Sequence, residues 1–261
     1  MDASASTQIT AEEPSGTGAE GLGRAEPATC VRVLHDAPEY SDLTIRCGED
    51  TYRLHKAIVC ARSPVLDAAC RKARFREGSE GTIVLQVSST ESSDDDNTGA
   101  DDPAAIRRMI SYIYTGDYTI DPRCEYACDT QSVGVHHEDR TLSQHAAVFG
   151  AAVKYQISGL RALAAARYAD AIDRHGGDHS DEDVAATIGI VHATTPPEVR
   201  ELRDATNGIL LKEYWLPLDY VVGKAIKAVD GLAFELMLML IEERHGLSGV
   251  LEWYFRNRDR L

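Results

Sequence analysis

The spacing of apolar residues changes at Leu54 and His55, and this change constrains the fold more than any other feature of the sequence. Residues 43–47, LTIRC, alternate apolar and polar side chains, which is typical of a half-buried strand. After the turn at 48–50, residues 51–54 return as the second strand of a hairpin. The chain must therefore leave a β-hairpin and enter a helical region within one or two residues.

The next segment, HKAIVCARSP, predicts two short helices in succession. Ile58 and Val59 lie on one face of a helix expected over 55–62. Ser63 and Pro64 then start a second helix, because serine caps free backbone N–H groups and proline at the first helical position has no N–H to lose.

Later segments add strands and a long series of helices. Residues 82–87 predict a third strand, and residues 118–120 predict a short further one. The predicted helices cover 103–116, 146–155, 160–172, 183–192, 198–211 and 232–244. The expected fold class is α+β, with a small mixed sheet flanked by helices and followed by an all-helical C-terminal extension.

Composition divides the chain into three parts. Residues 1–29 are rich in small and polar residues without apolar periodicity, which predicts a disordered segment. Residues 30–172 hold the predicted strands and paired helices, interrupted by an acidic insertion at 88–102 and a polar connector at 121–141. Residues 178–261 are predicted to form the helical extension.

The charge balance and the absence of targeting signals narrow the function classes. The chain has 27 Lys and Arg against 42 Asp and Glu, a formal charge of −15, which argues against a nucleic-acid partner because such binding requires cationic neutralisation of phosphates. No apolar run is long enough to span a bilayer, and the N-terminus shows no secretory signal, so we expect no membrane partner. Six dispersed cysteines predict a reducing, cytoplasmic or nuclear location.

Four segments occur together in an order that one known family shares. They are SDLTI at 41–45, LHKA at 54–57 with Arg62 and Ser63, MISYIYTGDY at 109–118, and AVKY at 152–155 followed by Leu160. Between residues 38 and 172 the chain resembles the BTB/POZ family, and the helical extension is similar to that of many BTB proteins of filamentous fungi. The resemblance implies the BTB/POZ fold, self-association and binding of other proteins.

The resemblance also places Lys56 close to Asp42, the aspartate that opens the first strand. Because a similar pair belongs to the charged pocket of BTB transcription factors, we expect Asp42 and Lys56 to form a largely buried, partner-binding ion pair. The alternative is that both side chains are solvated and unrelated. For His55 we predict a structural role, because a polar side chain at a strand-to-helix corner can satisfy an unpaired backbone N–H.

Phe75 and Glu77 match a second feature of the family. In cullin-binding BTB proteins, a hydrophobic-x-Glu motif near this position contacts the first helices of the cullin. An exposed aromatic residue beside a glutamate can anchor such an interface. The alternative is that Phe75 closes the core below the third strand.

Motifs for catalysis are absent from the sequence. It has no P-loop, no nucleophile elbow and no H-E-x-x-H, so we expect neither enzyme activity nor a cofactor. Cys124 and Cys128, followed by His136 and His137, have some resemblance to a zinc site. Adjacent histidines rarely bind one ion together, and the intervening loop is short for a zinc finger, so we expect no metal.

The apolar run at 236–241 has two interpretations. Methionine and leucine at this density could form a groove for a partner, but a buried helix is the interpretation we favour. Taken together, the sequence predicts a protein-interaction module, either a self-associating scaffold or adaptor that can serve a cullin-RING ubiquitin ligase, or a transcription co-regulator that binds partners through the charged pocket without contacting DNA.

Overall fold

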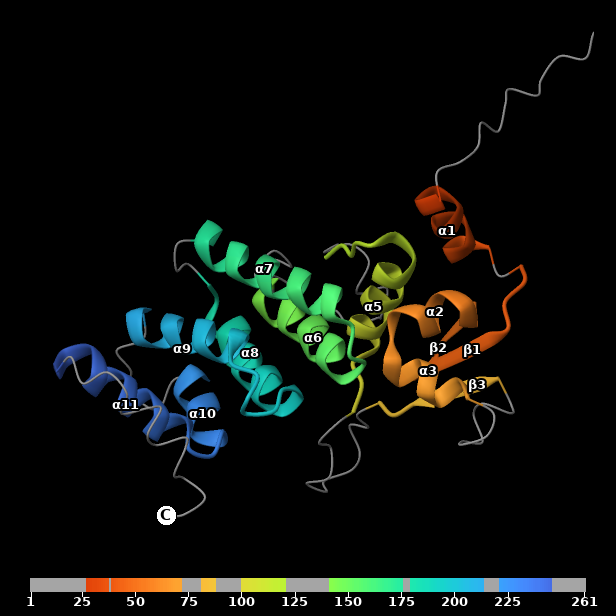
Figure 1. The fold of residues 1–261 in the computed structure, drawn as a ribbon. Helices are drawn as coiled ribbons and strands as arrows, with labels where there is room; N and C mark the ends of the chain where they lie inside the picture. Colours follow the sequence, from red (N-terminus) through yellow and green to blue (C-terminus); the bar gives the residue numbers. More distant parts are fainter. Residues whose placement is uncertain are drawn as a thin grey trace, which may run out of the picture.

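The structure is a computed structural model and describes residues 27–37, 39–71, 81–87, 100–120, 141–175, 179–213 and 221–245. Its elements are α1 (Pro27–Asp36), β1 (Leu43–Cys47), β2 (Asp50–Leu54), α2 (Lys56–Arg62), α3 (Pro64–Cys70), β3 (Thr82–Leu85), α5 (Pro103–Thr115), α6 (Thr141–Lys154), α7 (Ser158–His175), α8 (Asp181–Thr194), α9 (Glu201–Glu213), α10 (Val221–Ala228) and α11 (Leu232–His245). The sheet with α1 to α3 forms one end of an elongated molecule, α8 to α11 form the other, and α5 to α7 lie between them (Figure 1). The predicted α+β fold with a helical extension is confirmed.

The sheet is mixed and has the strand order β2-β1-β3. β1 pairs with β2 antiparallel, with Leu43 opposite Leu54, and with β3 in parallel, with Ile45 opposite Ile83. The hairpin turns at Gly48, whose φ of 59° suits a residue without a side chain. The side chains of Leu43, Ile45, Cys47, Ile83 and Leu85 are buried on one face, so the alternation seen in the sequence reflects a sheet covered by helices on one side.

Two of the helices start where the sequence predicted, and both starts follow local capping rules. The Ser63 hydroxyl accepts a hydrogen bond from the Leu66 N–H, and Pro64 occupies the first turn of α3. Asp102 caps α5 in the same way, before Pro103. The Ser63 hydroxyl also donates to the carbonyl oxygen of Tyr155 at 2.7 Å, so the same residue ties α3 to the end of α6.

The strand predicted at 118–120 is wrong, because the structure places no strand there. The backbone groups that a neighbouring strand would use are occupied by side chains. The Tyr118 N–H donates to the carboxylate of Asp117 at 2.8 Å, and the Tyr118 carbonyl oxygen accepts a hydrogen bond from Arg167 of α7. The third strand is also shorter than predicted: β3 ends at Leu85, and Val87 forms only an isolated parallel bridge with Asp101.

α8 packs directly on α6, and one buried carboxylate joins them. Asp183, in the first turn of α8, accepts hydrogen bonds from the backbone N–H groups of Leu142 at 2.9 Å and Ser143 at 3.0 Å. At the other end of the contact, a Cβ added at Gly150 would lie 2.6 Å from the Cβ of Thr194. A single cluster of buried apolar residues extends from β1 through α6 and α8 to the start of α11. The helical extension therefore shares its core with the sheet end of the molecule.

α10 was not predicted, and α11 differs from prediction in which of its apolar residues are buried. Leu238 is buried, but Met237 and Leu240 are 45% and 39% exposed, so the prediction that this whole run is core is wrong in part. The cause is Glu235, which is buried and accepts hydrogen bonds from Arg200 at 2.6 Å and Asn207 at 3.1 Å. This polar contact with α9 determines which face of α11 turns inward.

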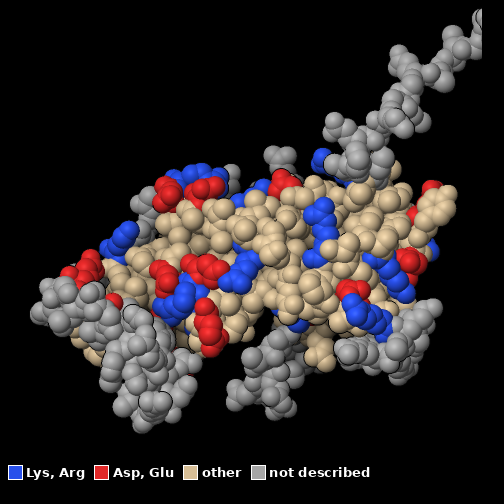
Figure 2. All heavy atoms as spheres, viewed as in Figure 1, with Lys and Arg blue, Asp and Glu red and all other residues tan. Residues whose placement is uncertain are grey.

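Charged side chains on the visible face of the described residues are interspersed, with neither sign gathered into one stripe (Figure 2). Among the ion pairs of the described residues, Arg161 of α7 with Glu201 of α9 joins two helices. No helix among the described residues combines the length and the apolar character that crossing a membrane requires.

Candidate protein-interaction site

The corner between β2 and α2 is the place where the sequence predicts a partner-binding site. Asp42 precedes β1, and its carboxylate accepts a hydrogen bond from the backbone N–H of Lys56, the first residue of α2, at 2.7 Å. The N–H of Asp42 in turn donates to the carbonyl oxygen of Leu54 at 3.1 Å. Asp42 therefore connects the start of one strand, the end of the next, and the helix that follows them.

The structure brings Asp42 and Lys56 together but not as the buried ion pair that we expected. The contact is made by the backbone amide of Lys56 rather than by its ammonium group, and Asp42 is exposed. The reason is the position of Asp42 beside the first turn of α2, where unpaired N–H groups favour an anionic acceptor. The partner-binding role of these two residues remains a prediction.

His55 is buried at this corner, but its side chain does not satisfy a backbone N–H at the start of α2 as the sequence predicted. Its ring joins neighbouring segments instead. Its Nε2 lies 2.8 Å from the carbonyl oxygen of Glu39, and its Nδ1 lies 3.0 Å from the hydroxyl of Tyr114 in α5. The backbone N–H of His55 donates to the same hydroxyl at 2.9 Å. These contacts fit the Nε2–H tautomer, in which the Tyr114 hydroxyl donates to Nδ1 and accepts from the backbone. Burial raises the pKa of Tyr114, so its hydroxyl keeps the proton that this arrangement needs.

The sequence reasoning missed Tyr40, which is the most exposed large side chain of the corner. Its side chain is 89% exposed, and its backbone has a φ of 63°, in the left-handed region that residues other than glycine rarely adopt. The chain is held on both sides of it, by the bond from His55 to Glu39 and by the bonds of Asp42. In the sequence only an aromatic residue after an acidic turn marks this position.

The other predicted site residues lie outside the described residues. This applies to Phe75 and Glu77, and to the cysteines and histidines at 124, 128, 136 and 137. Within the described part of the chain, no group of three or more His, Cys, Asp or Glu is placed to hold a metal ion.

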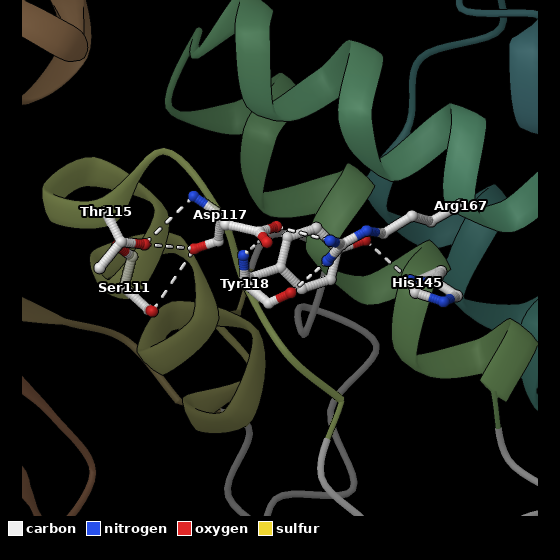
Figure 3. Close-up of polar contacts among 6 residues, drawn as sticks. All are labelled: Ser111, Thr115, Asp117, Tyr118, His145 and Arg167. Atoms are coloured by element: carbon white, nitrogen blue, oxygen red, sulfur yellow. Dashed lines mark hydrogen bonds and ion pairs between the residues drawn. The ribbon is translucent and has the colours of Figure 1, made fainter.

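A second polar cluster, formed by Asp117, Tyr118, His145 and Arg167, lies where α5, α6 and α7 meet (Figure 3). The Tyr118 hydroxyl lies 2.7 Å from Nδ1 of His145, and the Arg167 guanidinium carbon lies 4.4 Å from the centre of the Tyr118 ring. Arg167 also pairs with the carboxylate of Asp117 at 2.5 Å. Burial, reinforced by the positive charge of Arg167, lowers the pKa of His145 to about 4.

This cluster has the side chains of an acid–base site but not its accessibility. Tyr118 is 1% exposed and His145 is 6% exposed, so a substrate in solution does not reach the atoms that they share. Burial also raises the pKa of Tyr118 to about 12, which keeps its hydroxyl protonated at neutral pH. We conclude that the cluster holds three helices together.

The thiols of Cys47 and Cys60 are likewise unsuited to nucleophilic chemistry. Burial raises the pKa of Cys47 to about 11, and burial together with a contact with Cys70 raises the pKa of Cys60 to about 12. Neither side chain is a thiolate at neutral pH, and the thiolate is the reactive form.

The comparison with protein families agrees with this arrangement of a mixed sheet, a helix pair and a polar corner. The model of the BTB/POZ domain family matches residues 32–166. The match covers the sheet and the helices as far as the middle of α7. A search of curated proteins found no match for the chain.

Proposed function

The chain belongs to the BTB/POZ domain family and is a protein–protein interaction module; from this premise we propose that it acts as a self-associating adaptor whose contact surface is the corner around Tyr40, Asp42 and Lys56. The fold itself provides only a binding surface, so the role of the surface must be argued from its side chains.

The exposed ring of Tyr40 carries this proposal. Tyrosine is enriched among the residues that dominate binding energy at protein interfaces, because one side chain combines a large apolar area with a polar end. A ring that is 89% exposed loses much solvent contact when a partner covers it. The neighbouring backbone is already held by His55 and Asp42, so little further ordering is needed on binding.

The charged groups beside Tyr40 are of the kind that forms the polar rim around a central aromatic residue in an interface. Asp42 is exposed and Lys56 is half-buried, and both lie at the start of α2. Polar groups around a central aromatic residue add orientation to an interface and exclude water from its centre. With a formal charge of −15, two copies of the chain repel each other at long range, so an apolar anchor supports association better than charge does.

Light scattering of the full chain, measured over a range of concentrations, tests this proposal. We expect a dimer in the wild type and, for Tyr40→Ala, a dissociation constant about tenfold higher, which corresponds to about 1.4 kcal/mol. Tyr40→Phe keeps the ring and should retain the dimer. Val84→Ala, which truncates another exposed apolar side chain on β3, serves as the matched control. A wild type that stays monomeric, or a Tyr40→Ala variant that associates normally, would refute the proposal.

Binding to a cullin is the more specific form of the adaptor role, and its support comes from the Phe75-Arg76-Glu77 segment of the sequence. A pull-down with the N-terminal region of a cullin should capture the wild type and lose the Phe75→Ala Glu77→Ala variant. Equal capture of both chains, or of neither, would remove this form of the proposal without affecting self-association.

A further inference from the structure

The outward face of α11 is apolar, which is unusual for a helix at the surface. Met237 is 45% exposed, Leu240 is 39% exposed, and Phe234 on the preceding turn is 43% exposed. Residues three apart lie on one side of a helix, so these side chains form one stripe. We call this stripe the α11 face.

The rotation of α11 that exposes this face is fixed by buried contacts. Glu235 is 6% exposed, and its carboxylate is bound by Arg200, which precedes α9, and by Asn207 of α9. Turning the helix to bury Met237 and Leu240 would carry this carboxylate away from both partners and leave polar groups unpaired in the core. Leu232 and Leu238 occupy the inward side together with Glu235. The α11 face is therefore a stable feature of the fold.

The chain continues after α11 with a segment that has the complementary pattern. Residues 246–261, GLSGVLEWYFRNRDRL, lie outside the described residues. Three of their apolar residues have the spacing of one helical face: Val250, Leu251 and Tyr254. Trp253 and Phe255 flank this face. Removing these apolar side chains from water would therefore be favourable.

The geometry of the connection allows the segment to return along α11. Gly246 and Gly249 follow directly after His245, where glycines commonly end a helix and allow a tight turn. Residues 250–261 would extend roughly 18 Å as a helix, against roughly 21 Å for α11, at 1.5 Å per residue. An antiparallel return would place the arginines at 256, 258 and 260 towards the beginning of α11, where Asp230 is exposed.

We propose that the α11 face is the docking surface for the chain's own segment 246–261, which closes the helical extension as the second arm of a helical hairpin. A second copy of the chain fits this surface less well. A stable interface between two chains buries roughly 800 Å² on each partner, whereas the α11 face is one helix wide and matches one further helix.

Trp253 provides a direct probe of docking. The chain has two tryptophans, so Trp215→Phe leaves Trp253 as the only one. In this parent chain we expect the emission of a buried indole, independent of protein concentration. Met237→Glu and Leu240→Glu should each shift the emission to longer wavelength, because a carboxylate on the α11 face opposes burial of the ring. Val84→Glu puts the same charge on an exposed apolar position of β3, at the other end of the molecule, and should leave the emission unchanged.

Other outcomes of this experiment would overturn the proposal. They are the emission of a solvated indole in the parent chain, an emission that both α11 variants leave unchanged, and an emission that depends on protein concentration, since concentration dependence would assign the face to a second copy.

Hydrogen exchange gives a second test, in case the α11 variants fail to fold. In the full chain, the double variant Leu251→Glu Tyr254→Glu substitutes residues of the segment only and none of the described residues. Amide exchange over 232–245 should accelerate in this variant, while far-UV circular dichroism stays close to that of the wild type. Unchanged exchange in α11 would show that the segment does not cover it.

Discussion

The β2–α2 corner and the start of α6 are held by the same two kinds of contact: an aspartate that accepts backbone N–H groups, and a histidine that binds a tyrosine hydroxyl. The two places differ in how deeply the aspartate is buried. At the corner, Asp42 accepts the first N–H of α2, and His55 binds the hydroxyl of Tyr114. At the contact between α6 and α8, which we call the α6 junction, Asp183 accepts two N–H groups at the start of α6. In the same helix, His145 binds the hydroxyl of Tyr118.

The difference lies in the aspartates. Asp42 is exposed, so water can replace it as an acceptor, whereas Asp183 is 0% exposed, and nothing can take its place. The comparison shows that an identical hydrogen bond can belong to a surface that binds partners or to the core that carries that surface. Four changes would break or sharpen this comparison.

Asp183→Ala should have the largest effect. It leaves the N–H groups of Leu142 and Ser143 without an acceptor inside the protein. Both lost hydrogen bonds join a carboxylate to a buried donor, so we expect the free energy of unfolding to fall by about 4 kcal/mol. Urea unfolding followed by circular dichroism measures this loss. If Asp183→Ala lowered the free energy of unfolding less than Asp42→Ala does, the buried aspartate would not be the more important of the two.

Gly150→Ala should come next, because α6 and α8 touch closely at this residue. The new methyl group would lie 2.6 Å from the Cβ of Thr194, and relieving the overlap should cost about 3 kcal/mol of unfolding free energy. Gly208→Ala is the matched control, since a Cβ there meets nothing within 4 Å in α9. The control should be neutral or slightly stabilising. Equal effects of the two substitutions would show that the helices are not closely packed.

Acid should destabilise the α6 junction through His145. Its pKa is about 4 in the folded protein and near 6.5 when unfolded, so between these values the unfolded chain binds the additional proton. The stability that the neutral ring provides is complete above pH 6.5 and falls as the pH decreases towards 4. We expect His145 to contribute a loss of about 2 kcal/mol from pH 7 to pH 5, measured by urea unfolding at both values.

The control for this titration is His145→Gln, which cannot titrate in this range and can still accept a hydrogen bond from Tyr118. The acid-induced loss should be smaller in this variant by most of the predicted amount. His192, whose pKa burial also lowers to about 4, titrates in the same window and should account for part of what remains.

Asp42→Ala should have the smallest effect on stability. Removing an exposed cap from α2 should cost about 1 kcal/mol, because water can bind the Lys56 N–H in its place. The same variant should weaken self-association more clearly than it lowers the thermal midpoint, as light scattering beside a melting curve would show. A large loss of stability with unchanged association would mean that the corner is purely structural.

Predictions from the sequence succeeded where the governing interactions are local. Ser63 with Pro64, and Pro103 with Gly116, mark helix boundaries because capping and backbone geometry depend on neighbouring residues, and the structure has α3 and α5 at these positions. The position of His55 at a strand-to-helix corner was predictable for the same reason. The exposure of Tyr40 was not predictable from the sequence. Whether another element covers its side chain depends on the packing of distant segments, which the neighbouring residues do not reveal.

What the sequence determined by itself is the β1–β2 hairpin, the helices that begin at Pro64 and Pro103, the BTB/POZ resemblance, and the location of the corner. Only the tertiary structure decided that Asp42 binds an amide rather than the Lys56 ammonium, that Arg167 takes the backbone group which a strand at 118–120 would have used, and that Glu235 turns Met237 outward. Two of these outcomes depend on contacts between residues 35 to 49 positions apart. Local pattern fixes which groups need a partner, but packing of distant segments selects which partner each group finds.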